Sequence, residues 1–208
     1  MTPSEKITVV VASDNNYLQH LWVMLISLVE HTKNSNCIII YLIDGGITEQ
    51  LKAKLITYFY KQYGLKITSV TPNRELYDGC KVSHHIKEVA YYRISTPSLL
   101  PHTTKKAIYL DCDLILKDDI IKLWNIELKK YLIGAVSNPY FNHYSRLNLP
   151  KNKGYFNSGV MMINIELWRK YNISEKIIKF ISEETEKIIL HDQDALNAII
   201  RGNWLKIP

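Results

Sequence analysis

Short runs of β-branched and other apolar residues recur along the first half of the chain and alternate with segments of helical periodicity. Two such runs cover residues 7–12 and 37–43, and residues 65–70 are expected to form a third strand. Between them, apolar residues recur at helical spacing over residues 18–29 and 51–59. Strands that are apolar on both faces must be covered on both sides, and strand–helix–strand units form right-handed crossovers between parallel strands. The sequence therefore predicts an α/β fold with a mostly parallel central sheet flanked by helices.

The second half of the chain continues this pattern less regularly. Further strands are expected over residues 107–110, 132–137, 160–164 and 204–208. Helices are expected over residues 83–100, 120–124 and 173–189, near residue 165, and after Asp192, which is a suitable N-cap. Residues 138–154 are polar and aromatic without periodicity, and a loop of this length is usually functional or mobile. We find no linker or repeat, so residues 1–208 are expected to form a single domain.

Composition narrows the class of protein. The chain has 208 residues, 47% of them hydrophobic, which suits one large domain with a proper core and excludes disordered and fibrous proteins. Lysine and arginine number 26 against 20 aspartate and glutamate residues, giving a net charge of +6. The positive residues are spread along the chain without a basic tail, so nucleic acid binding is not indicated. A diffuse positive surface suits anionic small molecules or an anionic membrane face.

The cysteines and the N-terminal residues indicate the cellular compartment in which the protein is expected. Cys37, Cys80 and Cys112 are odd in number and far apart, as expected for reduced thiols. The N-terminus lacks the apolar core of a signal peptide, and no apolar run approaches the length of a membrane span. We therefore expect a cytoplasmic protein, for which the inner face of the membrane is a further place of action.

Two aspartates directly follow the apolar run at residues 107–110. If the backbone stays extended through Cys112, Asp111 and Asp113 point the same way. Two carboxylates that converge at the end of a buried strand suit a divalent cation such as magnesium or manganese, which would in turn hold phosphates. Short acidic pairs also occur as plain polar turns, and this motif alone does not decide between the two interpretations.

Other polar residues are expected near this pair. Parallel sheets bind ligands beyond the carboxyl ends of their strands, and Asp14 follows the first run as Asp111 follows the fourth. Arg93 carries a planar fork that matches phosphate or carboxylate oxygens, although a lone arginine on a helix more often forms a surface salt bridge. The chain has neither a Gly-x-Gly-x-x-Gly nor a Walker motif, which argues against dinucleotide oxidoreductases and P-loop enzymes.

Five motifs, in this order, resemble glycosyltransferase family 8, whose retaining enzymes include bacterial lipopolysaccharide galactosyl- and glucosyltransferases and the glycogenins. The motifs are residues 12–17 (ASDNNY), 85–86 (HI) with 91–93 (YYR), 109–113 (YLDCD), 156–160 (FNSGV) and 192–197 (DQDALN). The resemblance covers residues 7–208 and implies a GT-A fold, a nucleotide-binding α/β sandwich. It also implies transfer of a hexose from UDP-glucose or UDP-galactose to a glycan, glycolipid or glycoprotein acceptor, with manganese (or magnesium) as the cofactor.

The resemblance also implies a set of site residues. Asp111 and Asp113 would bind the metal ion. Arg93 would lie near the donor sugar and the first of these carboxylates, Asp192 would hydrogen-bond sugar hydroxyls, and Gln193 would lie closest to the anomeric face. The remaining residues that would bind the UDP-sugar are Ala12, Asp14, Asn16 and Tyr17 around the uracil, His85 near donor or acceptor, Cys112 between the two aspartates, and Asn138 and Asn157 near the sugar.

One feature of the family has no counterpart in this chain. Family members carry a C-terminal segment of the kind His-x-x-Gly-x-x-Lys-Pro-Trp, which supplies a third metal ligand and a lysine for the diphosphate. We expect a truncated chain, because residues 204–208 look like a strand rather than a tail. Two alternatives stay open: a catalytically weak module that binds nucleotide-sugars, and a sugar-phosphate nucleotidylyltransferase. The second normally needs a basic, glycine-rich loop where residues 13–16 are SDNN.

Overall fold

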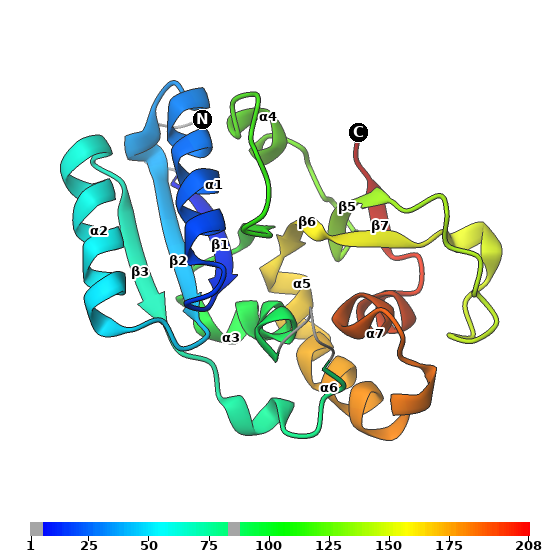
Figure 1. Cartoon of the computed structure of the whole chain (residues 1–208). Helices are drawn as coiled ribbons and strands as arrows, with labels where there is room; N and C mark the ends of the chain where they lie inside the picture. Colours follow the sequence, from blue (N-terminus) through cyan, green and yellow to red (C-terminus); the bar gives the residue numbers. More distant parts are fainter. Residues whose placement is uncertain (1–5, 83–87) are drawn as a thin grey trace.

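The computed structural model describes residues 6–82 and 88–208, and within these ranges seven strands form one sheet (Figure 1). The strands are β1 (Ile7–Ser13), β2 (Ile38–Asp44), β3 (Lys66–Val70), β4 (Lys106–Leu110), β5 (Ile133–Ser137), β6 (Phe156–Asn164) and β7 (Trp204–Lys206). Their order in the sheet is β3-β2-β1-β4-β6-β5-β7. All neighbours are parallel except β6, which runs antiparallel to both β4 and β5. The predicted α/β fold with a mostly parallel sheet is confirmed.

Helices cover both faces of this sheet. They are α1 (Leu18–His31), α2 (Glu49–Tyr63), α3 (Thr96–Leu99), α4 (Ile121–Trp124), α5 (Ile165–Lys170), α6 (Ile173–Glu183) and α7 (His191–Ile200). Val9 and Val11 of β1 pack in one apolar cluster with α1 and α2, whereas Val10 and Ala12 belong to a second cluster with α5, α6 and α7. Side chains of β1 therefore alternate between two hydrophobic clusters on opposite faces of the sheet, which is why every residue of that strand is buried. No helix in the described ranges is long and apolar enough to cross a membrane.

Three local expectations were wrong. In place of one helix over residues 83–100, the described part of this segment contains a 3₁₀ helix, Glu88–Ser95, followed by α3 with Pro97 in its first turn. The helix expected to reach residue 189 ends at Glu183, where a separate 3₁₀ turn follows. Asp192 is not the N-cap of α7, because that helix already begins at His191.

Arg169 in α5 organises the connection between α3 and β4. This connection has no regular structure, so its backbone carbonyl groups need donors from elsewhere. The guanidinium group of Arg169 donates to the carbonyl oxygens of Pro97, Leu100, Pro101, His102 and Thr104 over 2.6–3.3 Å. One side chain thus holds the path of the chain from the 3₁₀ helix into β4.

Replacing Arg169 by lysine should lower the free energy of unfolding by about 2 kcal/mol, because an ammonium group cannot span these separated acceptors. Urea denaturation of the two proteins measures the difference. Arg201→Lys is a matched control, since Arg201 has one such bond, to the carbonyl oxygen of Asn148 at 3.0 Å. If both variants lose the same free energy of unfolding, the several hydrogen bonds from the Arg169 guanidinium group do not contribute to stability as predicted.

Candidate active site

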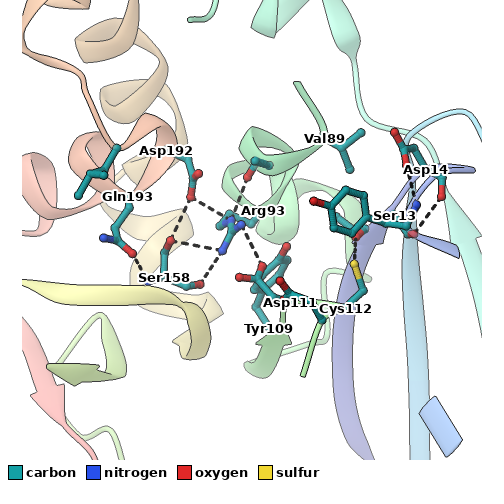
Figure 2. Close-up of a pocket in the computed structure, with 15 residues that line it drawn as sticks. Ser13, Asp14, Val89, Arg93, Tyr109, Asp111, Cys112, Ser158, Asp192 and Gln193 are labelled. Atoms are coloured by element: carbon teal, nitrogen blue, oxygen red, sulfur yellow. Dashed lines mark hydrogen bonds and ion pairs between the residues drawn. The ribbon is translucent and has the colours of Figure 1, made fainter. Parts of the chain in front are cut away.

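A cavity of about 310 Å³ lies at the carboxyl ends of β1 and β4 (Figure 2). The two strands are parallel neighbours, with Val11 beside Leu110, so the residues that follow them come together, as the sheet-edge rule predicts. The cavity is lined by Ala12, Ser13, Asp14, Tyr17, Val89, Ala90, Arg93, Tyr109, Asp111, Cys112, Asp113, Ser158, Leu190, Asp192 and Gln193. Segments from the two halves of the chain therefore meet in one hollow.

Arg93 lies between two carboxylates, with its side chain only 7% exposed. Its Nη2 donates to Oδ1 of Asp111 and its Nε to Oδ2 of Asp192, both at 3.0 Å. Its Nη1 donates to the carbonyl oxygen of Ser158 at 2.7 Å, and the guanidinium carbon lies 4.6 Å from the centre of the Tyr109 ring. In Figure 2 the two aspartates flank the arginine from opposite sides. The guanidinium group thus ties β4, β6 and α7 together.

The protonation of this cluster follows from burial and charge. Burial raises the pKa of Asp192 to about 6, because loss of hydration and the nearby charge of Asp111 outweigh the attraction of Arg93 and a hydrogen bond from Ser158. For Arg93, burial opposes the charged form, but the two carboxylates raise its pKa above the ordinary value. Arg93 therefore stays charged while Asp192 can change its charge in the mildly acidic range.

Asp111 and Asp113 both line the cavity, but not for the reason that the sequence suggested. The backbone does not stay extended through Cys112: β4 ends at Leu110, and Cys112 and Asp113 lie in a turn. The thiol of Cys112 points back at the carbonyl oxygen of Ala12, 3.5 Å away. A turn, rather than a strand, brings the second carboxylate to the cavity.

Gly159 of β6 leaves the space that Asp111 occupies. A Cβ atom at residue 159 would lie 2.6 Å from Oδ2 of Asp111 and 3.0 Å from Oδ1 of Asn157. The backbone N–H of Asp111 donates to the carbonyl oxygen of Gly159 at 2.8 Å, so the two residues are held side by side. Any side chain at this position would displace the carboxylate.

The two carboxylates fit a hard divalent cation. Among the residues that the structure describes, no three histidine, cysteine, aspartate or glutamate side chains gather into a metal-binding group. Magnesium and similar ions, however, are commonly held by one or two carboxylates together with the phosphates of a substrate. Asp111 and Asp113 match that requirement in ligand type and number.

The turn after β1 is organised by Asp14. Its buried carboxylate accepts the backbone N–H groups of Asn16 at 2.8 Å and Tyr17 at 3.0 Å. The Asn16 amide also donates to Asp14, at 3.1 Å, and Asn16 is exposed and does not line the cavity. Tyr17 and Ala12 do line it. Three of the four residues expected around the uracil therefore meet in the hollow, and the fourth supports the turn.

The other predicted residues stand apart from the lining. The side-chain oxygen of Asn138 accepts the backbone N–H of Tyr140 at 3.2 Å, and that of Asn157 accepts the N–H of Gly159 at 2.8 Å. Neither asparagine lines the cavity, although Asn157 directly precedes the lining residue Ser158. His85 lies outside the described residues.

Ser158 is a lining residue that sequence reasoning missed. Its backbone N–H donates to Oε1 of Gln193 at 3.0 Å, and its hydroxyl donates to Oδ2 of Asp192 at 3.2 Å. Its carbonyl oxygen accepts from Arg93. The available signal was its place between Asn157 and Gly159 in the fourth motif, but of its four hydrogen bonds, which include one from Arg93 to its hydroxyl at 3.3 Å, two are made by the backbone.

This geometry agrees with the comparisons with known proteins. The model of glycosyl transferase family 8 matches residues 8–208. General stress protein A of Bacillus subtilis is 37% identical over 100% of this chain and 73% of its own length. The lipopolysaccharide 1,2-glucosyltransferase of Escherichia coli is 27% identical over 99% of this chain, which spans 61% of that enzyme.

The fold of this chain also matches that of a solved structure. The galactosyltransferase LgtC, in complex with donor and acceptor sugar analogues, superimposes with a TM-score of 0.86 at 24% identity. The match covers 96% of this chain and 73% of LgtC. With the family model matched along almost the whole sequence, the chain belongs to glycosyltransferase family 8 and has the GT-A fold that its motifs implied.

Proposed function

We propose that this chain acts as a single GT-A domain that transfers a hexose from UDP-glucose or UDP-galactose to a hydroxyl of a glycan, glycolipid or glycoprotein, with retention of configuration. The observation that carries the proposal is the buried Arg93, paired with Asp111 and Asp192 inside the cavity. Arg93 connects a carboxylate suited to the diphosphate side of a donor, Asp111, with one suited to the sugar side, Asp192. The glucosyl- and galactosyltransferase names of two similar proteins support a hexose donor.

The charges that develop during transfer explain the roles of these residues. Breaking the bond between the anomeric carbon and UDP leaves negative charge on the diphosphate and positive charge on the sugar ring. A manganese or magnesium ion held by Asp111 and Asp113 would neutralise the diphosphate. Arg93 holds the Asp111 carboxylate in place, while the Asp192 carboxylate and the Gln193 amide oxygen would face the positive ring.

The residues near the sugar favour attack from the face on which the phosphate leaves. Retention in glycoside hydrolysis usually requires a carboxylate nucleophile. Here Asp192 is occupied by Arg93 and Ser158, and Gln193 is an amide. We infer that the acceptor oxygen bonds to the anomeric carbon as the phosphate departs, and that a phosphate oxygen takes the proton of the acceptor hydroxyl. A covalent sugar trapped on Asp192 or another side chain would contradict this.

The proposed function is tested by a donor screen. The protein, with manganese, should release UDP from UDP-glucose or UDP-galactose when acceptor glycans are supplied, and calorimetry should show UDP binding. Binding without transfer or hydrolysis would favour the catalytically weak binding module. Formation of UDP-sugar from UTP and a sugar phosphate would favour the nucleotidylyltransferase instead.

Replacing Asp113 by asparagine should lower the rate of manganese-dependent UDP-sugar turnover by roughly 100-fold or more, because the amide lacks the charge that the cation requires. The fold should be unaffected, since Asp113 is exposed in a turn, and circular dichroism can verify this. Asp118→Asn is a matched control: Asp118 is also exposed, and its hydrogen-bond partners in the described ranges are the neighbouring Lys122 and the backbone N–H of Asp119. Unchanged turnover in Asp113→Asn would rule out the metal-binding role.

Turnover should also depend on the charge of Asp192. Because its pKa is about 6, its carboxylate gains a proton as the pH falls through that value and can no longer stabilise the positive ring. We therefore expect kcat/KM to fall on the acid side of pH 6. The Asp192→Asn variant should lose this acid limb and be slower throughout. An acid limb that persists in this variant would assign the titration to another group.

A further inference from the structure

Asp194 is completely buried in the first turn of α7, yet it does not line the cavity. Its Oδ2 accepts the backbone N–H groups of Ile189 and Leu190, each at 2.8 Å, and Nη1 of Arg146 at 3.0 Å. Its Oδ1 accepts the hydroxyl of Tyr155 at 2.7 Å and a longer bond from Arg146. All of these partners in the described ranges are donors, so Asp194 acts purely as an acceptor.

This arrangement fixes the direction of the hydrogen bonds around Tyr155. A phenol has one proton to donate, and here that proton goes to the carboxylate of Asp194. Burial, reinforced by the charge of Asp194, raises the pKa of Tyr155, so the hydroxyl keeps its proton. The Tyr155 oxygen can therefore only accept from Gln193, whose Nε2 lies 3.3 Å away.

The other end of the Gln193 amide is fixed as well. Its Oε1 accepts the backbone N–H of Ser158 at 3.0 Å, a donor that cannot reverse. An amide whose nitrogen faces an obligatory acceptor and whose oxygen faces an obligatory donor has one allowed orientation. In Figure 2 the oxygen of Gln193 points toward Ser158 and its nitrogen points away.

Resting on the proposed function, we propose that Asp194 is a positioning residue for Gln193. Through Tyr155 it holds the NH₂ end of the Gln193 amide, and together with the N–H of Ser158 this keeps the amide oxygen on the side of Ser158 and Asp192. A reversed amide would place partial positive charge where positive charge develops on the sugar. The hydrogen-bonding direction set by one buried carboxylate is thus relayed over two residues to the cavity.

The same carboxylate also holds the backbone that carries Asp192. His191, the first residue of α7, lies in the left-handed region with φ of 50°, a strained conformation for a residue other than glycine. The N–H groups of Ile189 and Leu190 that Asp194 accepts lie immediately before it. Arg146 links the loop of residues 138–154 to α7 through its ion pair with Asp194 at 3.0 Å.

The test uses Tyr155→Phe, Asp194→Asn and the double variant. Tyr155→Phe removes the relay but keeps the ring that stacks on Phe141 at 3.6 Å, so it should fold. Each single variant should lower kcat about 10- to 100-fold, as expected when a group at the reacting centre is misplaced, with little change in KM for the UDP-sugar. The double variant should be no slower than the slower single one, because both changes break the same relay.

Tyr63→Phe is the matched control. The hydroxyl of Tyr63, the last residue of α2, also donates to a carboxylate, that of Glu30 at 3.1 Å, but Tyr63 does not line the cavity. This variant should leave kcat unchanged. Unaltered kcat in Tyr155→Phe, or fully additive losses in the double variant, would overturn the relay.

A second readout does not require turnover. The side-chain NH₂ resonances of Gln193, identified by their absence in a Gln193→Glu variant, should shift in the ¹⁵N spectrum of Tyr155→Phe and not in that of Tyr63→Phe. If the wild-type protein transfers no sugar, the proposed function fails while these spectra still test the relay. Gln193 resonances that are identical in wild type and Tyr155→Phe would overturn it.

Discussion

The buried guanidinium group of Arg93 is the interaction on which the rest of the structure depends. Removing a charged group from water is costly unless opposite charges and hydrogen-bond acceptors replace the lost hydration. Arg93 obtains these from Asp111 at the end of β4, Asp192 at the start of α7 and the backbone of Ser158 in β6. None of these partners is close to it in sequence. The packing of α7 beside β4 and β6 and the assembly of the candidate site therefore depend on the same side chain.

The first half of the fold could be predicted from sequence because β1 and β2 have no exposed residue and are mostly apolar. Such continuous apolar runs can be recognised without knowledge of distant partners. The segment around Arg93 was misjudged for the complementary reason: Tyr91 to Ser95 are all buried, so no single apolar stripe exists for a helical periodicity to report. Asp192 was misjudged as an N-cap because the local signal is the same whether the carboxylate turns to its own helix or to a distant arginine.

Whether a site residue could be predicted depended on how far its contacts lie from it in the sequence. The meeting of Asp14 and Asp111 could be predicted from the sheet-edge rule, whereas Asp192 and Gln193 came only from the family resemblance. Asn16 and Asn138 turn their side chains to nearby backbone or side-chain groups, a common competing role for asparagine. Asp194 belongs to the fifth motif, but the sequence assigned it no role, since its partners Arg146 and Tyr155 lie in an aperiodic loop and just before a strand.

The reversed direction of β6 has a consequence for how the site tolerates change. In a purely parallel sheet only carboxyl ends face the ligand edge, but β6 brings its amino end there, beside the end of β4. Peptide groups at residues 158 and 159 consequently supply a donor to Gln193 and acceptors to Arg93 and Asp111. These groups carry no titratable proton and are the same for any residue except proline. Part of the site is thus encoded in the topology itself, where a substitution can alter the serine hydroxyl but cannot delete the peptide dipoles.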